Sequence, residues 1–435
     1  MNILVISSTP WSSNNSFGNT YSNLFEGMGG LTFANIALKP VTETDPIVDS
    51  CFSISENALI ANLLHSRLET GREVDVKTTL AKDLSGGSRQ TEFAVKEFAR
   101  KKRWMIMFWA RDLIWKLGRW KSPQLLKYLD AVKPDLIFQP IYFVSHPNDI
   151  VHFVKKYTGV PMVGYVSDDV YTLRQFSLSP FYWLDRIYKR RKVKRTIQQC
   201  EILYVISELQ KQEYEKIFGV PCKILTKCAD FSGEPLVKTQ YNTPLQLVFT
   251  GNIGTNRWKS LAMIAEALEQ INQNGVRAQL RIYTATPLTA KMEKALQKGE
   301  SSFIMGSIPA SEVPKTQADA DILVHVEATD LKNKLAVRQS FSTKLVDYFK
   351  TARPILAVGP RDVASIDHLI RNDCALTGET VEEVKQALLS VLDNPDKLND
   401  LSRKAYACGK RNHDKEKMQQ MLQADLSKIV KEERA

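Results

Sequence analysis

Short apolar runs and amphipathic stretches alternate along most of this chain, a pattern typical of an α/β protein. Residues 1–8 indicate a buried strand rather than a signal peptide, and residues 9–18 a loop rich in Ser and Asn. Asn19-Thr20 is then expected to cap a helix. Strand, small-residue loop and helix form the first unit of a doubly wound domain. Further strands are expected at 31–38, 135–140, 160–166 and 202–206.

A stretch rich in turn formers, residues 230–243, separates this series from a second one. The second series starts with a strand at 245–250 and a helix at 259–272, and further strands follow at 278–283, 321–326 and 355–358. A chain of 435 residues is too long for one ordinary core. We therefore predict two Rossmann-like, doubly wound α/β domains, 1–240 and 241–435, that face a central cleft. The last helices are expected to pack back on the N-terminal domain.

The charge balance calls for an anionic partner, because 59 Lys and Arg against 48 Asp and Glu give a net charge of +11. A phosphorylated ligand, an anionic membrane and nucleic acid all satisfy this need. No helix-turn-helix, finger or aromatic-sheet signature is found, so no nucleic acid partner is expected. Six scattered cysteines without CxxC spacing predict reduced thiols in a cytoplasmic protein. No apolar run is long enough to span a bilayer.

Two basic segments lie in the N-terminal half. Residues 98–121 interleave eight basic residues with four of the chain's seven Trp, and residues 180–200 hold seven basic residues in a predicted helix. Basic helices with interfacial aromatics are typical of peripheral membrane elements, so we predict contact with an anionic membrane surface through both segments. The alternative is ordinary amphipathic helices with buried Trp side chains and a solvated basic face.

The stretch 339–360 carries the most specific pattern. Ser342 and Thr343 precede an amphipathic helix, which leads into a short apolar strand. The start of such a helix presents unpaired N–H groups and the positive end of the dipole, and Lys344 adds a mobile charge. We therefore predict a phosphate site here. Asp347, one turn later, is placed to accept hydrogen bonds from a ribose.

A Gly-containing loop at 251–254 follows the first strand of the second series. By itself it also fits a tight turn without a ligand. Arg257 and Lys259 stand at the start of the next helix, where two positive charges suit a pyrophosphate. Two anion sites in one domain favour a nucleotide diphosphate as the ligand.

Asp168 and Asp169 follow the strand at 160–166, where parallel sheets place their chemistry. Both are candidates for the base that an acceptor hydroxyl needs, and we nominate Asp169 as catalytic. The alternative is a capping pair on a loop. His146 is a further candidate base, on a similar loop after a strand.

Together these motifs resemble the GT-B glycosyltransferases, most of all the retaining group called family four, or glycosyl transferases group 1. The resemblance covers essentially the whole chain and is strongest at residues 342–360. It implies that Arg257 and Lys344 neutralise the leaving diphosphate, without a metal or other cofactor. Carried over by position, the donor-binding residues are Gly251, Asn252, Gly254, Arg257, Ser307, Ile308, Gln339, Ser342, Thr343, Lys344 and Asp347. On the acceptor side the N-terminal loop provides Gly18 and Asn19, next to Asp168.

The chain departs from the family pattern at three of these positions. The two glutamates of the family's motif are replaced by Gln339 and Asp347, and the usual basic residue after the first glycine is Asn252. Because Gln339 carries no charge, the departures leave the stereochemical outcome open.

The expected function is hexosyl transfer from a nucleotide sugar to a saccharide or lipid-linked saccharide, in surface polysaccharide synthesis. The alternatives are a nucleotide-sugar epimerase of the same fold and a non-catalytic sugar-nucleotide-binding scaffold. Neither the sugar, the base nor the acceptor can be chosen from pattern, since a few hydrogen bonds in the pocket decide them.

Overall fold

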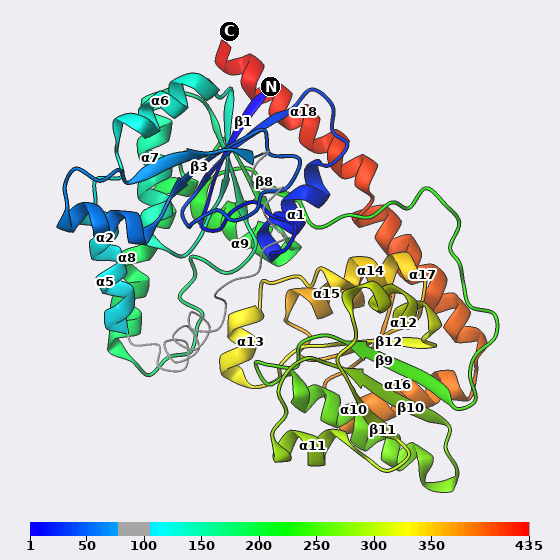
Figure 1. Cartoon of the computed structure of the whole chain (residues 1–435). Coiled ribbons are helices and arrows are strands. Elements are labelled where there is room, and N and C mark those ends of the chain that lie inside the picture. Colours follow the sequence, from blue (N-terminus) through cyan, green and yellow to red (C-terminus); the bar gives the residue numbers. More distant parts are fainter. Residues whose placement is uncertain (77–104, 435) are drawn as a thin grey trace.

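The computed structural model describes residues 1–76 and 105–434, and it contains two parallel sheets, each with helices on both sides (Figure 1). The first sheet consists of β1 (Asn2–Ser7), β2 (Thr32–Ala37), β3 (Ser50–Ile54), β4 (Gly71–Val74), β5 (Leu136–Pro140), β6 (Met162–Val166), β7 (Ile202–Val205) and β8 (Cys222–Ile224). The second consists of β9 (Leu245–Thr250), β10 (Ala278–Tyr283), β11 (Ser302–Gly306), β12 (Ile322–Val326), β13 (Ile355–Val358) and β14 (Leu376–Gly378). The predicted two-sheet α/β fold is confirmed.

Helices follow most strands, as doubly wound topology requires. Those of the N-terminal half are α1 (Ser16–Phe25), α2 (Glu56–Leu64), α5 (Met105–Leu117), α6 (Pro123–Val132), α7 (Ser145–Thr158), α8 (Pro180–Ile197) and α9 (Glu208–Phe218). Those of the C-terminal half are α10 (Arg257–Ile271), α11 (Ala290–Leu296), α12 (Val313–Asp319), α13 (Leu331–Val337), α14 (Lys344–Thr351), α15 (Ala364–Arg371), α16 (Val381–Leu392), α17 (Asp396–Asn412) and α18 (Lys415–Arg434).

The strand order places a switch point in each sheet. In the order β4-β3-β2-β1-β5-β6-β7-β8 the direction of winding changes between β1 and β5, and β4 pairs antiparallel to β3. In the order β11-β10-β9-β12-β13-β14 it changes between β9 and β12. Ligands of open α/β sheets bind outside the carboxyl ends of strands at such points.

The cores follow from the apolar strands. Ile3, Leu4, Val5 and Ile6 of β1 are completely buried, as expected of a strand covered on both faces. The C-terminal helix α18 lies beside the N-terminal domain (Figure 1). Its residues Leu422 and Leu426 belong to the core cluster that contains Ile3 and Val5. The N-terminal half is therefore packed against the last helix of the chain.

Three predicted helix starts are displaced. Helix α1 begins at Ser16, not after Asn19, because Asn15 is the cap: its side chain accepts from the Gly18 N–H at 2.9 Å. Helix α7 begins at Ser145, so His146 lies in its first turn and not on a loop. Helix α10 begins at Arg257, two residues earlier than predicted.

Gly18 has a packing role in the first turn of α1. A Cβ atom at this position would lie 2.0 Å from the carbonyl oxygen of Ser12. We expect Gly18→Ala to lower the free energy of unfolding by about 2 kcal/mol, since the clash is with backbone that must shift. Gly29→Ala is the control, because nothing lies within 4 Å of the Cβ there. Urea unfolding of both variants measures the difference, and equal stabilities would contradict this packing role.

Candidate active site

The start of α14 is the predicted phosphate site. Thr343 is the N-cap, and its own φ of −59° and ψ of −23° are already helical. No side chain caps this helix among the described residues. The positive end of the dipole is therefore left for another partner, as in anion sites at helix starts.

Lys344 is held in one place by the loop after β9. Its Nζ donates to the carbonyl oxygen of Thr250 at 2.9 Å and lies 5.4 Å from the ring centre of Phe249. A Cβ on Gly251, whose φ is +144°, would lie 1.7 Å from that Nζ. The prediction of a mobile cation was therefore wrong, because a residue without a side chain at 251 lets the amine settle against the loop.

Arg257 and Glu327 form an ion pair behind this loop, at the switch point between β9 and β12. Arg257 Nε donates to Glu327 Oε2 at 3.1 Å, and the Glu327 side chain is only 5% exposed. Burial raises the pKa of Glu327, while the charge of Arg257 opposes that rise. Burial and the nearby Arg257 together lower the pKa of Lys344. Arg257 is paired with this buried carboxylate, while Lys344 bonds a backbone carbonyl, so the Lys344 charge is left for an anion.

A cavity of about 630 Å³ opens beside Lys344, and neither Arg257 nor Glu327 is among its lining residues. Seven of the predicted donor-side residues line it: Gly251, Asn252, Gly254, Ser307, Ile308, Lys344 and Asp347. Asn252 shapes the loop, because its Oδ1 accepts from the Gly254 N–H at 2.6 Å. The structure therefore brings together loop and helix positions up to 96 residues apart, Gly251 and Asp347.

Asp347 has a partner that sequence reasoning missed. Lys227 Nζ donates to both carboxylate oxygens of Asp347, at 2.7 and 2.9 Å. Lys227 follows β8 and therefore comes from the N-terminal series. No local motif surrounds it, so no sequence signal marked it. A ribose that binds Asp347 has to share the carboxylate with this lysine or displace it.

A second cavity, of about 330 Å³, lies on the other side of the same helix start. Thr343 and Val346 of α14 line it, together with residues after β5, β6 and β7 and with Ser16, Phe17, Thr20 and Tyr21 of α1. Gly18 and Asn19, predicted for the acceptor side, do not line it. Residues 16, 17, 20 and 21 of α1 line the cavity instead, while Gly18 packs on Ser12, so the acceptor role of Gly18 and Asn19 stays a prediction.

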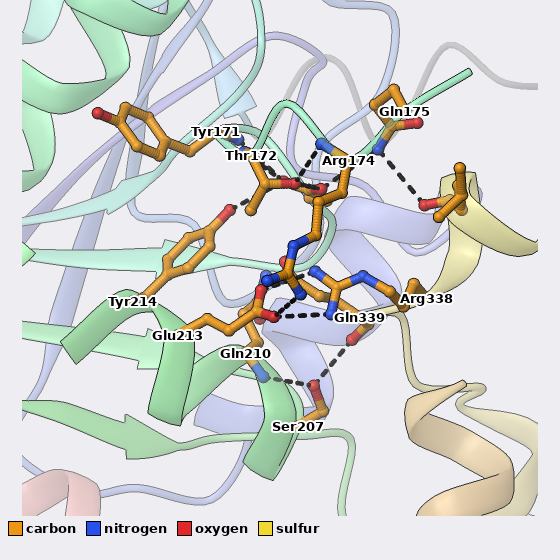
Figure 2. A network of polar contacts seen from close by, with 12 residues as sticks. Tyr171, Thr172, Arg174, Gln175, Ser207, Gln210, Glu213, Tyr214, Arg338 and Gln339 are labelled. Atoms are coloured by element: carbon orange, nitrogen blue, oxygen red, sulfur yellow. Dashed lines mark hydrogen bonds and ion pairs between the residues drawn. The ribbon is translucent and has the colours of Figure 1, made fainter. Parts of the chain in front are cut away.

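Gln339 faces the N-terminal domain instead of the donor cavity. It is fully buried, its Nε2 donates to Glu213 of α9, and its carbonyl oxygen accepts from Ser207 Oγ at 2.8 Å (Figure 2). Gln339 does not line the donor cavity, and its assignment to the donor stays a prediction. Position 339 carries no carboxylate, but the carboxylate of Glu213 in the N-terminal domain lies beside it.

Arg338 and Arg174 bind the same Glu213 from the two domains (Figure 2). Arg338 forms two hydrogen bonds to it, at 2.8 and 2.7 Å. Burial alone would raise the pKa of Glu213, but the hydrogen bonds and charge of Arg338 outweigh burial and lower it. The result is a charged clamp across the domain boundary.

Asp168 and Asp169 make different contacts, which suit them to different roles. Asp169 is buried, and it accepts from the N–H groups of Tyr171 and Thr172 at 3.1 and 2.8 Å and from Gln175 at 3.2 Å. These are the bonds of a turn-stabilising carboxylate, so Asp169 is a poor candidate base, and the capping alternative describes it better. Asp168 accepts from Ser340 Oγ at 2.9 Å across the domain boundary. Desolvation raises its pKa, which suits a base better than an ordinary aspartate.

The two arginines around Glu213 allow a matched test of the clamp. We expect Arg338→Ala to lower the free energy of unfolding by about 2 kcal/mol, because charged hydrogen bonds are lost and Glu213 is left half-buried. Arg174→Ala should cost less than about 1 kcal/mol, since that side chain is 64% exposed. Urea unfolding of both variants compares them. Equal losses would mean that Arg338 contributes no more than a surface ion pair.

The chain is similar to known proteins in part of its sequence and in its fold. Residues 244–394 match the family described as Glycosyl transferases group 1. Sucrose-phosphate synthase from Thermosynechococcus elongatus is similar in fold, with a TM-score of 0.58 and 12% identity over 99% of each chain. HepE from Anabaena, solved in complex with UDP, has a TM-score of 0.61 and 11% identity over 98% of this chain and 100% of its own. No curated protein matches the sequence.

The matched family covers β9 to β14 and the helices that form the 630 Å³ cavity. The fold similarity extends over both sheets and, for sucrose-phosphate synthase, over nearly the full length of both chains. The fold comparison agrees with the architecture of two sheets, and the family match covers the second of them. The chain therefore has the two-domain GT-B fold, and its residues 244–394 are similar to the glycosyl transferases group 1 family.

Proposed function

We propose that this enzyme transfers a hexosyl group from a nucleoside diphosphate sugar, held at the start of α14, to a saccharide acceptor in the second cavity. The observation that carries the proposal is the position of α14 between two cavities. Lys344 and Asp347 line the larger one, and Thr343 and Val346 line the smaller one. A sugar on the diphosphate would thus lie at the boundary of both spaces.

The chemistry follows from the leaving group. A nucleoside diphosphate departs as an anion, and Lys344, Arg257 and the start of α14 would stabilise its charge. The proposal includes no bound metal, because these cations supply the positive charge. The acceptor hydroxyl gives its proton to Asp168 or to the leaving phosphate. Ser342 and Thr343 are proposed as phosphate contacts, and Ser307 and Ile308 as contacts of the base.

The acceptor is proposed to be a lipid-linked saccharide, used in surface polysaccharide synthesis on the cytoplasmic membrane face. The support is the basic N-terminal domain, whose helix α8 has seven basic residues in its last twelve positions, 186–197, besides an exposed apolar side. No helix in the described part of the chain is long and apolar enough to cross a membrane. Peripheral attachment is therefore the form of membrane contact that we propose.

A thermal-shift panel of UDP-, GDP- and other nucleotide sugars tests donor binding. UDP donors come first, because HepE was solved with UDP. The proposal expects stabilisation by one nucleotide class and release of the nucleoside diphosphate only when an acceptor is present. Turnover of the sugar nucleotide without any acceptor would favour an epimerase, and binding without turnover would favour a scaffold.

A further inference from the structure

A groove of about 1010 Å³ lies on the N-terminal domain, between the end of α5 and helix α7. None of its lining residues lines the donor or acceptor cavity. Four exposed cations line it: Lys116, Arg119, Lys121 and Lys156. Asp149 is the single acid among the described lining residues, and it is paired with Lys192 of α8. The groove therefore carries an excess of positive charge.

The walls of the groove are aromatic. Trp120 packs edge-on against Phe153 at 5.4 Å, and Tyr157 stacks on Phe153 at 6.3 Å. Lys121 Nζ lies 5.2 Å from the ring centre of Trp120 and 5.1 Å from that of Phe153. These cation–π contacts orient the amine beside a rigid wall, as in built anion sites, rather than leaving it on a free stem.

His146 gives a second, independent sign of a ligand. It lines the groove, is only 6% exposed, and stacks on Trp115 at 4.3 Å. Its Nδ1 is buried without a hydrogen-bond partner among the described residues. Burial and the surrounding cations, Arg111 first, lower its pKa to about 3. The ring is therefore neutral at pH 7 and can donate one N–H. It also stands in the first turn of α7, which no side chain caps in the described structure.

An exposed apolar face borders the groove. It is formed by α2, α5 and α8, which lie together at one end of the N-terminal domain (Figure 1). Trp109 of α5 reaches α8, donating to Asp185 at 3.2 Å and meeting the Phe181 ring at 6.0 Å. The exposed members include Leu63 and Leu64 of α2, Leu113 and Leu117 of α5, and Phe181, Leu184 and Tyr188 of α8.

Helix α8 shows that this exposure is not an ordinary solvent face. It buries Asp185, Arg186 and Lys189, while Phe181 and Leu184 are 58% and 60% exposed. Lys189 is bound to Asp185 at 2.8 Å. A helix that buries these three charged residues and exposes large apolar ones is suited to an apolar environment outside the protein. The first part of the predicted segment 98–121 lies outside the described residues, whereas Trp115 and Trp120 pack inward, as the core alternative had it.

We propose that the groove binds the phosphate of an anionic phospholipid head group while the apolar face of α2, α5 and α8 rests on the bilayer. Its biological purpose depends on the proposed lipid-linked acceptor. The charge complementarity favours a phospholipid surface: cations and an N–H donor meet the phosphate, and the neighbouring leucines and aromatics meet the acyl boundary.

Vesicle sedimentation with the full chain tests this site. The vesicles consist of phosphatidylcholine alone or of an equal mixture with phosphatidylglycerol. We expect preference for the anionic mixture, and about 30-fold weaker partitioning for Arg119→Gln/Lys156→Gln, at about fivefold per cation. The matched control is Lys294→Gln/Lys397→Gln, which removes two exposed cations from the C-terminal domain. It should partition like the wild type.

Equal partitioning of the groove variant and the wild type, or an equal loss in the control, would overturn the proposal. So would wild-type binding that is the same on neutral vesicles, or displacement of the protein from anionic vesicles by single-stranded RNA at stoichiometric amounts. Melting temperatures verify that each variant is folded. Nucleotide-sugar thermal shifts of the wild type test the proposed function separately, so failure of one leaves the other standing.

Discussion

Replacing Lys344 with alanine is expected to lower kcat/KM for sugar transfer by about 100- to 1000-fold, the usual loss when one preorganised charge donor is removed from a leaving-group site. Little side-chain entropy is lost when Lys344 binds the diphosphate, because its amine already bonds the Thr250 carbonyl and packs over Phe249. Removing it takes away the cation that lines the donor cavity and leaves the start of α14 as the remaining nearby dipole.

Lys350→Ala is the control for this variant, because it removes an exposed lysine from the other end of the same helix. Steady-state kinetics on both variants, together with nucleotide thermal shifts, separate lost binding from lost rate. Because burial lowers the pKa of Lys344, its cation is also lost at lower pH than that of an ordinary lysine. Activity of the wild type should therefore decline on the alkaline side earlier than an unperturbed lysine would allow. A Lys344→Ala enzyme as active as Lys350→Ala would place the diphosphate elsewhere.

The sequence was informative where a signal is local. The helix start at residue 343 and the loop at 251–254 are short patterns with a known geometry, and the structure places both at one cavity. The order of apolar runs likewise contains most of the two sheets, since parallel strands such as β1, β6 and β13 are short, buried and largely apolar.

The contacts across the domain boundary could not be predicted. Lys227 and Asp347 are 120 positions apart, and Asp168 and Ser340 are 172 apart. Nothing in the pattern of a strand or helix states which residue of another domain it will meet. Gln339 is the clearest case: its position in a donor motif suggested the sugar, while its neighbour in space is Glu213.

The errors at the N-terminus have a different physical reason. Asn15 and Asn19 are equally good helix caps. The choice of Asn19 placed the predicted start of the helix about one turn too late. Asp169 was ambiguous for a similar cause, because a carboxylate after a strand serves equally well as a base and as the acceptor of two backbone N–H groups.

The second large effect is expected at the Arg257–Glu327 pair. Arg257→Met should reduce kcat by about 100-fold, because the proposed mechanism loses its second positive charge near the leaving group. It should also lower the free energy of unfolding by about 2 kcal/mol, because a buried carboxylate loses its partner. This loss is smaller than the roughly 3–5 kcal/mol expected for a fully buried pair, since the Arg257 side chain is 30% exposed.

Arg257→Met/Glu327→Gln separates these two consequences. Glutamine keeps the size of Glu327 and removes the unpaired charge, so the double variant should regain most of the lost stability but none of the lost rate. Urea unfolding and steady-state kinetics on the single and double variants make the comparison. A double variant as unstable as the single one would show that Glu327 is tolerated without Arg257, and recovery of kcat would show that Arg257 acts only by holding Glu327.

The pH dependence of stability gives this cycle its sharpest readout. Burial already holds the pKa of Glu327 above its ordinary value of 4.5, and Arg257 restrains the rise. In Arg257→Met that restraint is gone, so the folded state keeps its proton to higher pH than the unfolded state does. Because the folded state then binds more protons, the free energy of unfolding must fall as pH rises from about 4.5 through the raised pKa. This decline should be steeper than in the wild type and absent from the double variant, since glutamine does not titrate; a decline that persists in the double variant would assign it to another carboxyl group.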